Sequence, residues 1–210
     1  FRRVLFRSAM DSFINRLKDS KESPLFNSML QEADEFLSKE RVKDFLGKNP
    51  TELREVIQTI PADLVQSVTL STMHGCPPYE IEKICAYLIT QKNLNTYVKL
   101  NPTLLGFDKT RKTLDSLGYN YVELKRESFT KDLQMEDAVP MIRRLKKLAD
   151  SKGKFFGLKL SNTLGVRNFG QVLPGEEKYM SGRALYPLTV ILASLLANEF
   201  NGLIPISFSG

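Results

Sequence analysis

The alternation of short β-rich runs with helical stripes after Pro61 constrains the fold of this chain more than any other feature. The β-rich runs hold branched or aromatic residues between turn residues, at 67–70, 97–100, 121–124, 155–160 and 204–208. Stripes with helical spacing separate them, at residues 81–88, 110–117, 138–149 and 188–196. Such alternation implies βαβ crossovers and a parallel sheet, either a β/α-barrel or an open doubly wound sheet.

The part before Pro61 has a different pattern. Residues 11–60 are helical in character, and Asn49-Pro50-Thr51 sets off a short helix at 52–59. One apolar stripe in a charged background marks the main helix, formed by Phe26, Met29, Leu30, Ala33 and Leu37. We therefore predict a helical segment over residues 9–60 and an α/β domain over residues 61–210.

The composition fits a globular protein with a sizeable core, since 42% of the 210 residues are hydrophobic and 26% are charged. No apolar run reaches the length of a membrane span. Cys76 and Cys85 are too few for a disulfide framework and cannot alone hold an iron-sulfur cluster. We expect a reducing cytoplasm as the location.

The net charge of +6 raises the question of a nucleic-acid partner. Half of that excess comes from Arg2, Arg3 and Arg7 in the opening octet FRRVLFRS, which reads like a translated sequencing adapter. We exclude residues 1–8 from the fold as a probable artefact and expect no nucleic-acid partner.

In both architectures the ligand lies at the carboxyl ends of the strands, and polar residues follow each predicted strand. These residues are 71–78, 101–103, 125–128, 161–163 and 209–210. Asn101, Ser161, Asn162 and Thr163 suit hydrogen bonding to a heteroaromatic ring. Lys99 and Lys159, within strands, point either inward, beside an anionic flavin, or outward to water.

Cys76 shares a stiff loop with His74, the only histidine. Its thiol is a candidate general acid or base once its pKa is adjusted. A Cys/His nucleophilic pair, a metal site and an inert structural loop are the alternatives, and we assign no metal ligand. Cys85 lies on the apolar stripe of its helix and belongs to the core. The long connection 173–183 is typical of a lid, and Ser181-Gly182 at a helix start suits an anion or a ring edge.

Several unusual stretches occur together in order: LSTMHGCPP (70–78), VKLNPTLL (98–105), LKLSNTLG (158–165), LPGEEKYMSGRAL (173–185) and PISFSG (205–210). With them the chain resembles the flavin-binding domain of dihydroorotate dehydrogenase and dihydropyrimidine dehydrogenase. It is more closely similar to the selenate reductase iron-sulfur subunit family, whose members are large multidomain relatives of dihydropyrimidine dehydrogenase.

The resemblance implies a partial (β/α)8 TIM barrel that holds flavin mononucleotide (FMN). Asn162 and Thr163 would lie near the flavin and a pyrimidine-like substrate, with Ser181 and Gly182 beside the cofactor. Cys76 would match the family's acid, and Ser209 and Gly210 would begin the phosphate-binding loop. An extra strand-helix unit around residues 121–148 leaves open whether Lys99 or Lys159 is the flavin lysine.

Five strands of about eight suggest a fragment that lacks the first and last strands. The resemblance implies iron-sulfur, FAD and NAD(P)H modules elsewhere in the parent chain. We expect a flavin-dependent oxidoreductase that passes electrons through FMN to a small-molecule substrate, with other modules of a redox complex as partners. The alternatives are a Schiff-base aldolase using Lys99, Lys125 or Lys159, and a non-catalytic scaffold domain.

Overall fold

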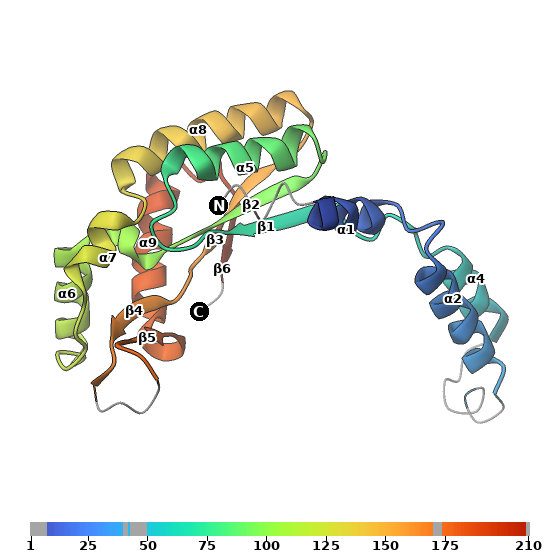
Figure 1. The fold of residues 1–210 in the computed structure, drawn as a ribbon, viewed down its shortest axis with the longest axis horizontal. Helices are drawn as coiled ribbons and strands as arrows, with labels where there is room; N and C mark the ends of the chain where they lie inside the picture. Colours follow the sequence, from blue (N-terminus) through green and yellow to red (C-terminus); the bar gives the residue numbers. More distant parts are fainter. Residues whose placement is uncertain (1–7, 40–41, 43–49, 170–173, 209–210) are drawn as a thin grey trace. The chain divides into compact units, whose positions relative to one another are not determined.

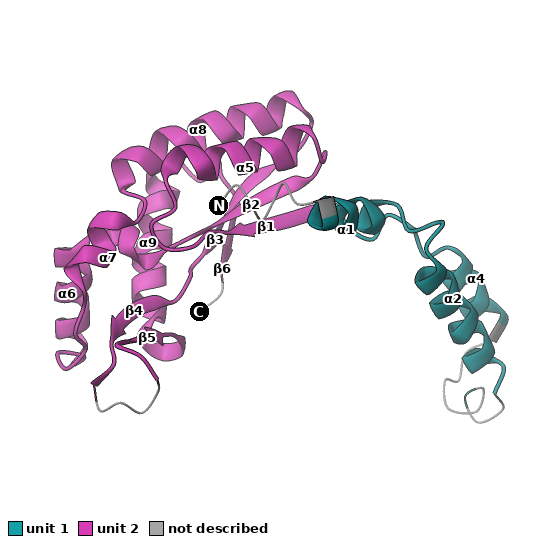
Figure 2. Ribbon diagram, viewed as in Figure 1, with its two compact units in different colours: residues 1–66 teal, residues 67–210 magenta. Residues whose placement is uncertain are grey.

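A computed structural model describes residues 8–39, 42, 50–169 and 174–208. The chain divides into two compact units, residues 1–66 and 67–210 (Figure 2). The sequence places this boundary slightly earlier, after residue 60. Residues 1–7 of the excluded octet lie outside the described residues, as do Ser209 and Gly210 of the predicted phosphate loop.

The first unit is helical, with α1 (Ser8–Lys18), α2 (Pro24–Leu37) and α4 (Pro50–Gln58). Ser23 begins α2 because its hydroxyl accepts a hydrogen bond from the Phe26 amide at 3.4 Å. The predicted stripe on α2 is only partly buried: Leu37 is 8% exposed, whereas Met29 is 61% exposed. Among the described residues, no helix is both long and apolar enough to cross a membrane.

The second unit is built on a parallel four-stranded sheet in the order β1-β2-β3-β6 (Figure 1). The strands are β1 (Ser67–Ser71), β2 (Asn95–Leu100), β3 (Phe156–Leu160) and β6 (Ile206–Phe208). Among the described residues, neighbours in the sheet follow the order of the chain and no strand pairs on the other side of β1, whereas a doubly wound sheet adds strands on both sides of its first strand. The winding is therefore that of a β/α-barrel.

Helices form the connections between these strands. The helix α5 (Pro78–Thr90) joins β1 to β2, and η1 (Pro102–Leu105), α6 (Phe107–Ser116), α7 (Arg126–Lys131) and α8 (Met135–Ser151) join β2 to β3. A hairpin of β4 (Leu164–Arg167) and β5 (Glu177–Met180), then η3 (Gly182–Ala184) and α9 (Tyr186–Glu199), precede β6.

The core lies between the sheet and its helices. The helices α5 and α8 run side by side along one face of the sheet (Figure 1). Alternate strand residues such as Val98 and Leu158 are completely buried on that face. Cys85 of α5 is also completely buried, and this confirms its predicted place in the core.

The predicted strand at residues 121–124 is wrong. In the structure Leu124 forms only an isolated antiparallel bridge with Val166, and β2 pairs directly with β3. The guanidinium of Arg111 on α6 donates hydrogen bonds to the carbonyls of Tyr119, at 2.9 Å, and of Val122. Arg111 thus holds the segment against α6, and the Arg167 amide of β4 donates to the Glu123 carbonyl at 3.0 Å, so the segment lies beside the hairpin and not in the sheet.

Candidate active site

A row of polar side chains crosses the sheet near the carboxyl ends of its strands. Ser71 pairs in register with Lys99, Lys99 with Lys159, and Lys159 with Ser207. Residues in register on parallel strands point to the same face, here the face opposite the buried Val98. The Nζ of Lys159 lies 3.4 Å from the Ser207 hydroxyl. Both lysines therefore point inward, and neither extends towards the helix layer.

Immediately before this row, the inner face is filled by an aromatic ring. Tyr97 pairs in register with Gly157, and a Cβ atom added to Gly157 would lie only 2.4 Å from the Tyr97 ring. The ring also packs edge to face on Phe155, with centroids 5.4 Å apart. The absence of a side chain at residue 157 thus lets the tyrosine close the sheet surface below the lysines.

The second feature of the site is a buried carboxylate, Asp132, between α7 and α8. Its side chain is 1% exposed. The Oδ2 atom accepts hydrogen bonds from His74 Nδ1 and Thr103 Oγ1, both at 2.8 Å, and from Asn101 Nδ2 at 3.2 Å. The Oδ1 atom accepts from the Gly75 amide at 2.8 Å. One carboxylate therefore holds together the loops that follow β1 and β2.

The ionised carboxylate also sets the direction of the hydrogen bonds around it, because it can only accept. The Asn101 amide must turn its nitrogen towards Asp132, so its oxygen faces Asn162 and accepts from Asn162 Nδ2 at 2.8 Å. This leaves the Asn162 Oδ1 atom as an acceptor. A continuous chain of hydrogen bonds therefore links the end of β3 to His74.

The electrostatics favour an ion pair between Asp132 and His74. Burial alone would raise the pKa of Asp132, but the hydrogen bonds from His74, Thr103 and the Gly75 amide outweigh it, so the pKa is lowered. The hydrogen bond to Asp132 raises the pKa of His74 despite its partial burial. The imidazole is 37% exposed and lies parallel to the Tyr179 ring, with centroids 6.3 Å apart.

The other predicted site residues have surroundings of their own. Cys76 is 5% exposed at the start of α5, and burial raises the pKa of its thiol. The Ser161 hydroxyl lies 3.0 Å from the buried Thr189 hydroxyl of α9, so it ties β3 to that helix. Thr163 is half-buried just before β4, and Ser181 and Gly182 are exposed at the start of η3.

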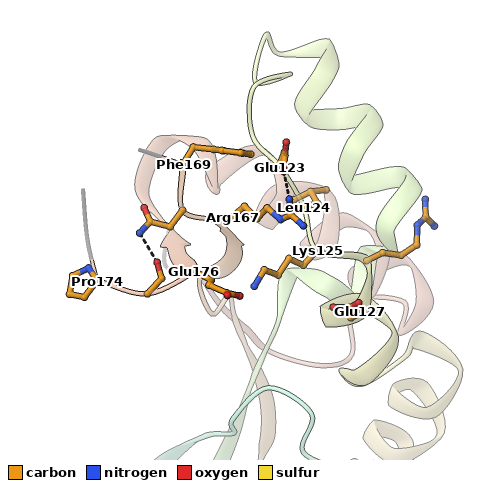
Figure 3. Close-up of a pocket in the computed structure, with 11 residues that line it drawn as sticks. Glu123, Leu124, Lys125, Glu127, Arg167, Phe169, Pro174 and Glu176 are labelled. Carbon is orange, nitrogen blue, oxygen red and sulfur yellow. Dashed lines mark hydrogen bonds and ion pairs between the residues drawn. The ribbon is translucent and has the colours of Figure 1, made fainter. Parts of the chain in front are cut away.

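The predicted lid at residues 173–183 contains a regular strand, β5, paired antiparallel with β4. Beside this hairpin lies an open pocket of about 1040 Å³ (Figure 3). Two basic residues that line it are ion-paired: Lys125 lies 2.8 Å from Glu177, and Arg167 lies 3.4 Å from Glu123. Lys125, a Schiff-base candidate by sequence, is thus neutralised by a carboxylate.

Sequence reasoning missed Asp132, the organising residue of the cluster. It lies 58 residues from His74 and follows a short helix instead of a predicted strand. Thr103 and Tyr179 were also missed as site residues, although both fall within the stretches that carry the family resemblance. Only the folded chain brings these three residues to the carboxyl edge of the sheet.

Parallel strands joined by helices, with polar side chains gathered at their carboxyl ends, define a β/α-barrel with its site in the position typical of barrel enzymes. The chain belongs to the family described as "Oxidoreductase YgfK, N-terminal TIM-barrel domain", whose model matches residues 5–210. This confirms the predicted barrel class, and the family's description is that of the N-terminal domain of an oxidoreductase.

Two relatives are 47% identical over 212 aligned residues, and both are named "Putative oxidoreductase YgfK", from Escherichia coli K12 and O157:H7. The match covers 96% of this chain and 20% of each relative, so the chain spans about one fifth of their length. No solved structure matches the chain.

Proposed function

We propose that this domain binds FMN at the carboxyl ends of its strands and passes electrons between the flavin and a small acceptor. The observation that carries the proposal is the in-register pair Lys99 and Lys159 on the inner face, flanked by Ser71 and Ser207. Two ammonium groups side by side on this partly buried face suit an anionic ligand, because an anion would offset the repulsion between the two like charges.

The residues at this edge fit such a cofactor. Lys99 and Lys159 would lie beside the reduced ring, Asn101 and Asn162 would offer amide contacts, and Ser207 leads to the proposed phosphate loop. Bound flavin would supply hydride or single-electron transfer, while the protein contributes orientation and charge. The resemblance left open whether Lys99 or Lys159 meets the flavin; the register supports a role for both.

We further propose that the domain functions beside iron-sulfur, FAD and NAD(P)H modules of a longer chain, as the resemblance to dihydropyrimidine dehydrogenase and the selenate reductase family implies. The family's description as an N-terminal domain and the fivefold greater length of the curated relatives support the presence of further modules, and the cofactors of those modules rest on the resemblance alone. Ser181 and Gly182 beside the cofactor and Cys76 as the proton donor remain predictions from the resemblance.

The test is to purify the full-length protein that carries this domain, denature it, and identify the released flavin by absorbance and mass. We expect one FMN per chain, and loss of FMN from the double variant Lys99→Met/Lys159→Met. Lys147→Met, an exposed position on α8, is the matched control and should retain flavin. A folded, iron-replete protein without FMN would refute the proposal.

A lysine Schiff base is the second candidate, favoured by the same juxtaposition, because a neighbouring cation can activate a lysine amine. Borohydride with a small ketone or aldehyde would then trap a covalent adduct on Lys99 or Lys159, detected by mass. A yellow protein with no adduct would exclude this candidate.

A further inference from the structure

His74 and Asp132 form a pair that the lysine row does not require. We propose that His74 is the proton-transferring residue of this site, exchanging the proton on Nε2 with the oxygen of a small carbonyl or quinone-like acceptor. Asp132 acts as its positioning residue. The inference rests on the proposed function for the source of electrons, and its own test distinguishes the two.

The orientation of the ring supports this role. Because Asp132 accepts from Nδ1 at 2.8 Å, the neutral imidazole keeps its proton on that nitrogen, and Nε2 is the nitrogen that gains and loses a proton. The ring is 37% exposed, whereas the carboxylate that holds it is 1% exposed. A fixed, partly exposed imidazole backed by a buried carboxylate is the arrangement that general acid-base catalysis uses.

Donors from the loops after β1 and β2 fix the position of the Asp132 carboxylate. Thr103 and the Gly75 amide donate to it, and Gly75 has a φ of +76°, which places its amide in this position. Asn101 adds a further donor and passes the hydrogen-bond chain to Asn162. A substrate that reached both Asn162 Oδ1 and the protonated His74 Nε2 would meet one hydrogen-bond acceptor and one donor.

The charged groups around His74 come from several elements. Asp132 faces it from the α7–α8 connection and contributes most to its raised pKa, and Glu177 of β5 adds a smaller effect in the same direction. Lys125 neutralises Glu177 through its ion pair at 2.8 Å, and Tyr179 presents its ring. Cys76, by contrast, is 5% exposed in the same loop.

With reduced flavin, bound as proposed above, as the two-electron donor, the quinone would gain two electrons, the Nε2–H bond of the imidazolium would break, and a new O–H bond would form. The proton that the flavin loses on oxidation would leave to solvent. His74 becomes neutral with its remaining proton on Nδ1, and solvent supplies both the second proton of the hydroquinone and the proton that restores the imidazolium.

The first measurement uses the 210-residue chain and needs no cofactor. His74 is the only histidine, so its ring protons give one titration curve by NMR. We expect a midpoint above that of a free histidine, and a lower midpoint in Asp132→Asn. Asp150→Asn, the same change in an exposed ion pair of α8, should leave the curve unchanged. A midpoint that does not respond to Asp132→Asn overturns the pairing.

The second measurement uses the full-length protein, chemically reduced and then reoxidised by menadione, which takes protons, or by ferricyanide, which takes none. We expect His74→Gln to slow the reduction of menadione by about 10²–10⁴-fold, which is the usual contribution of a general acid. The rate of ferricyanide reduction should stay unchanged. The wild-type menadione rate should fall as pH rises through the His74 pKa, and this decline should move to lower pH in Asp132→Asn.

Three outcomes separate the possibilities. An unchanged ratio of menadione to ferricyanide rates in His74→Gln overturns the role of His74. So does a loss of menadione reduction in Cys76→Ser while His74→Gln remains active. If the wild type carries no flavin and reduces neither acceptor, the proposed function fails, whereas the NMR result for His74 and Asp132 stands separately.

Discussion

Replacement of Gly157 by alanine is expected to destabilise the barrel unit through a single steric conflict. The new Cβ atom would lie 2.4 Å and 2.6 Å from two atoms of the Tyr97 ring and 2.9 Å from the Pro205 carbonyl oxygen. Ordinary contacts between carbon atoms are about 3.5–4.0 Å, so the ring must move by roughly 1 Å. Phe155 packs on that ring, and the Pro205 oxygen is backbone that accepts from the Leu158 amide at 2.8 Å.

The expected magnitude follows from these neighbours. Overpacking usually lowers the free energy of unfolding by about 1–3 kcal/mol. Because the new Cβ atom conflicts with both a packed ring and a backbone atom, we expect a loss of about 3 kcal/mol. The φ of Gly157 is not positive, so alanine adds no backbone strain there. The change would therefore remove a large share of the roughly 5–15 kcal/mol that stabilises a typical domain.

Urea unfolding of the full chain, followed by circular dichroism and tyrosine fluorescence, would measure the effect, since the chain has no tryptophan. Gly165→Ala is the matched control: this strand glycine is also buried, but its added Cβ would meet only a Glu177 oxygen at 3.9 Å. We expect the control to stay within about 0.5 kcal/mol of the wild type. A Gly157→Ala protein as stable as the control would refute the packing argument.

Three further predictions concern buried groups. Asp132→Ala should lower the free energy of unfolding by about 3 kcal/mol, measured in urea, because buried donors including the Thr103 hydroxyl lose their acceptor; a loss under 1 kcal/mol would contradict this. The pair with His74 should stabilise the fold most between the ordinary pKa values of 3.8 and 6.5, since the folded pKa of His74 is raised and that of Asp132 is lowered. Stability should thus fall as pH rises through the folded pKa of His74, and more in the wild type than in Asp132→Asn; parallel pH profiles would argue against the pair. Cys85→Ser should lower the free energy of unfolding by about 1–3 kcal/mol, measured by thermal or urea unfolding, because it buries a hydroxyl in an apolar helix interface. Cys85→Ala adds no polar group, so its smaller effect measures the lost packing alone.

The local pattern predicted most elements because strands and helices bury their faces with different periods. The stripe through Ile84, Cys85 and Leu88 marks a helix whose stripe residues are all buried, and branched residues mark β2 and β3 within two residues of their observed ends. The same reasoning failed at residues 121–124. Tyr121 has the composition of a strand residue but is 70% exposed, because Arg111 holds the nearby carbonyls.

The candidate site, too, could be predicted from the sequence only in part. The residues that follow the strands could be identified from sequence because parallel strands bring their carboxyl ends to one edge, and this reasoning found Asn101 and Asn162, which are in hydrogen-bond contact. The inward direction of Lys99 and Lys159 could not be determined, since it depends on which face the helices cover. Once Val98 is known to be buried, alternation places both lysines on the other face.

The sequence by itself determined an α/β fold of alternating strands and helices and a polar carboxyl edge, because these depend on periodicity within short segments, and the resemblance selected the barrel over a doubly wound sheet. Only the tertiary structure decided that Lys99 and Lys159 are neighbours and that Asp132 orients His74. Those relations join residues 60 and 58 positions apart, and the register of the sheet and the packing of loops create them. No local signal in a chain encodes a distance between segments that meet only when it folds.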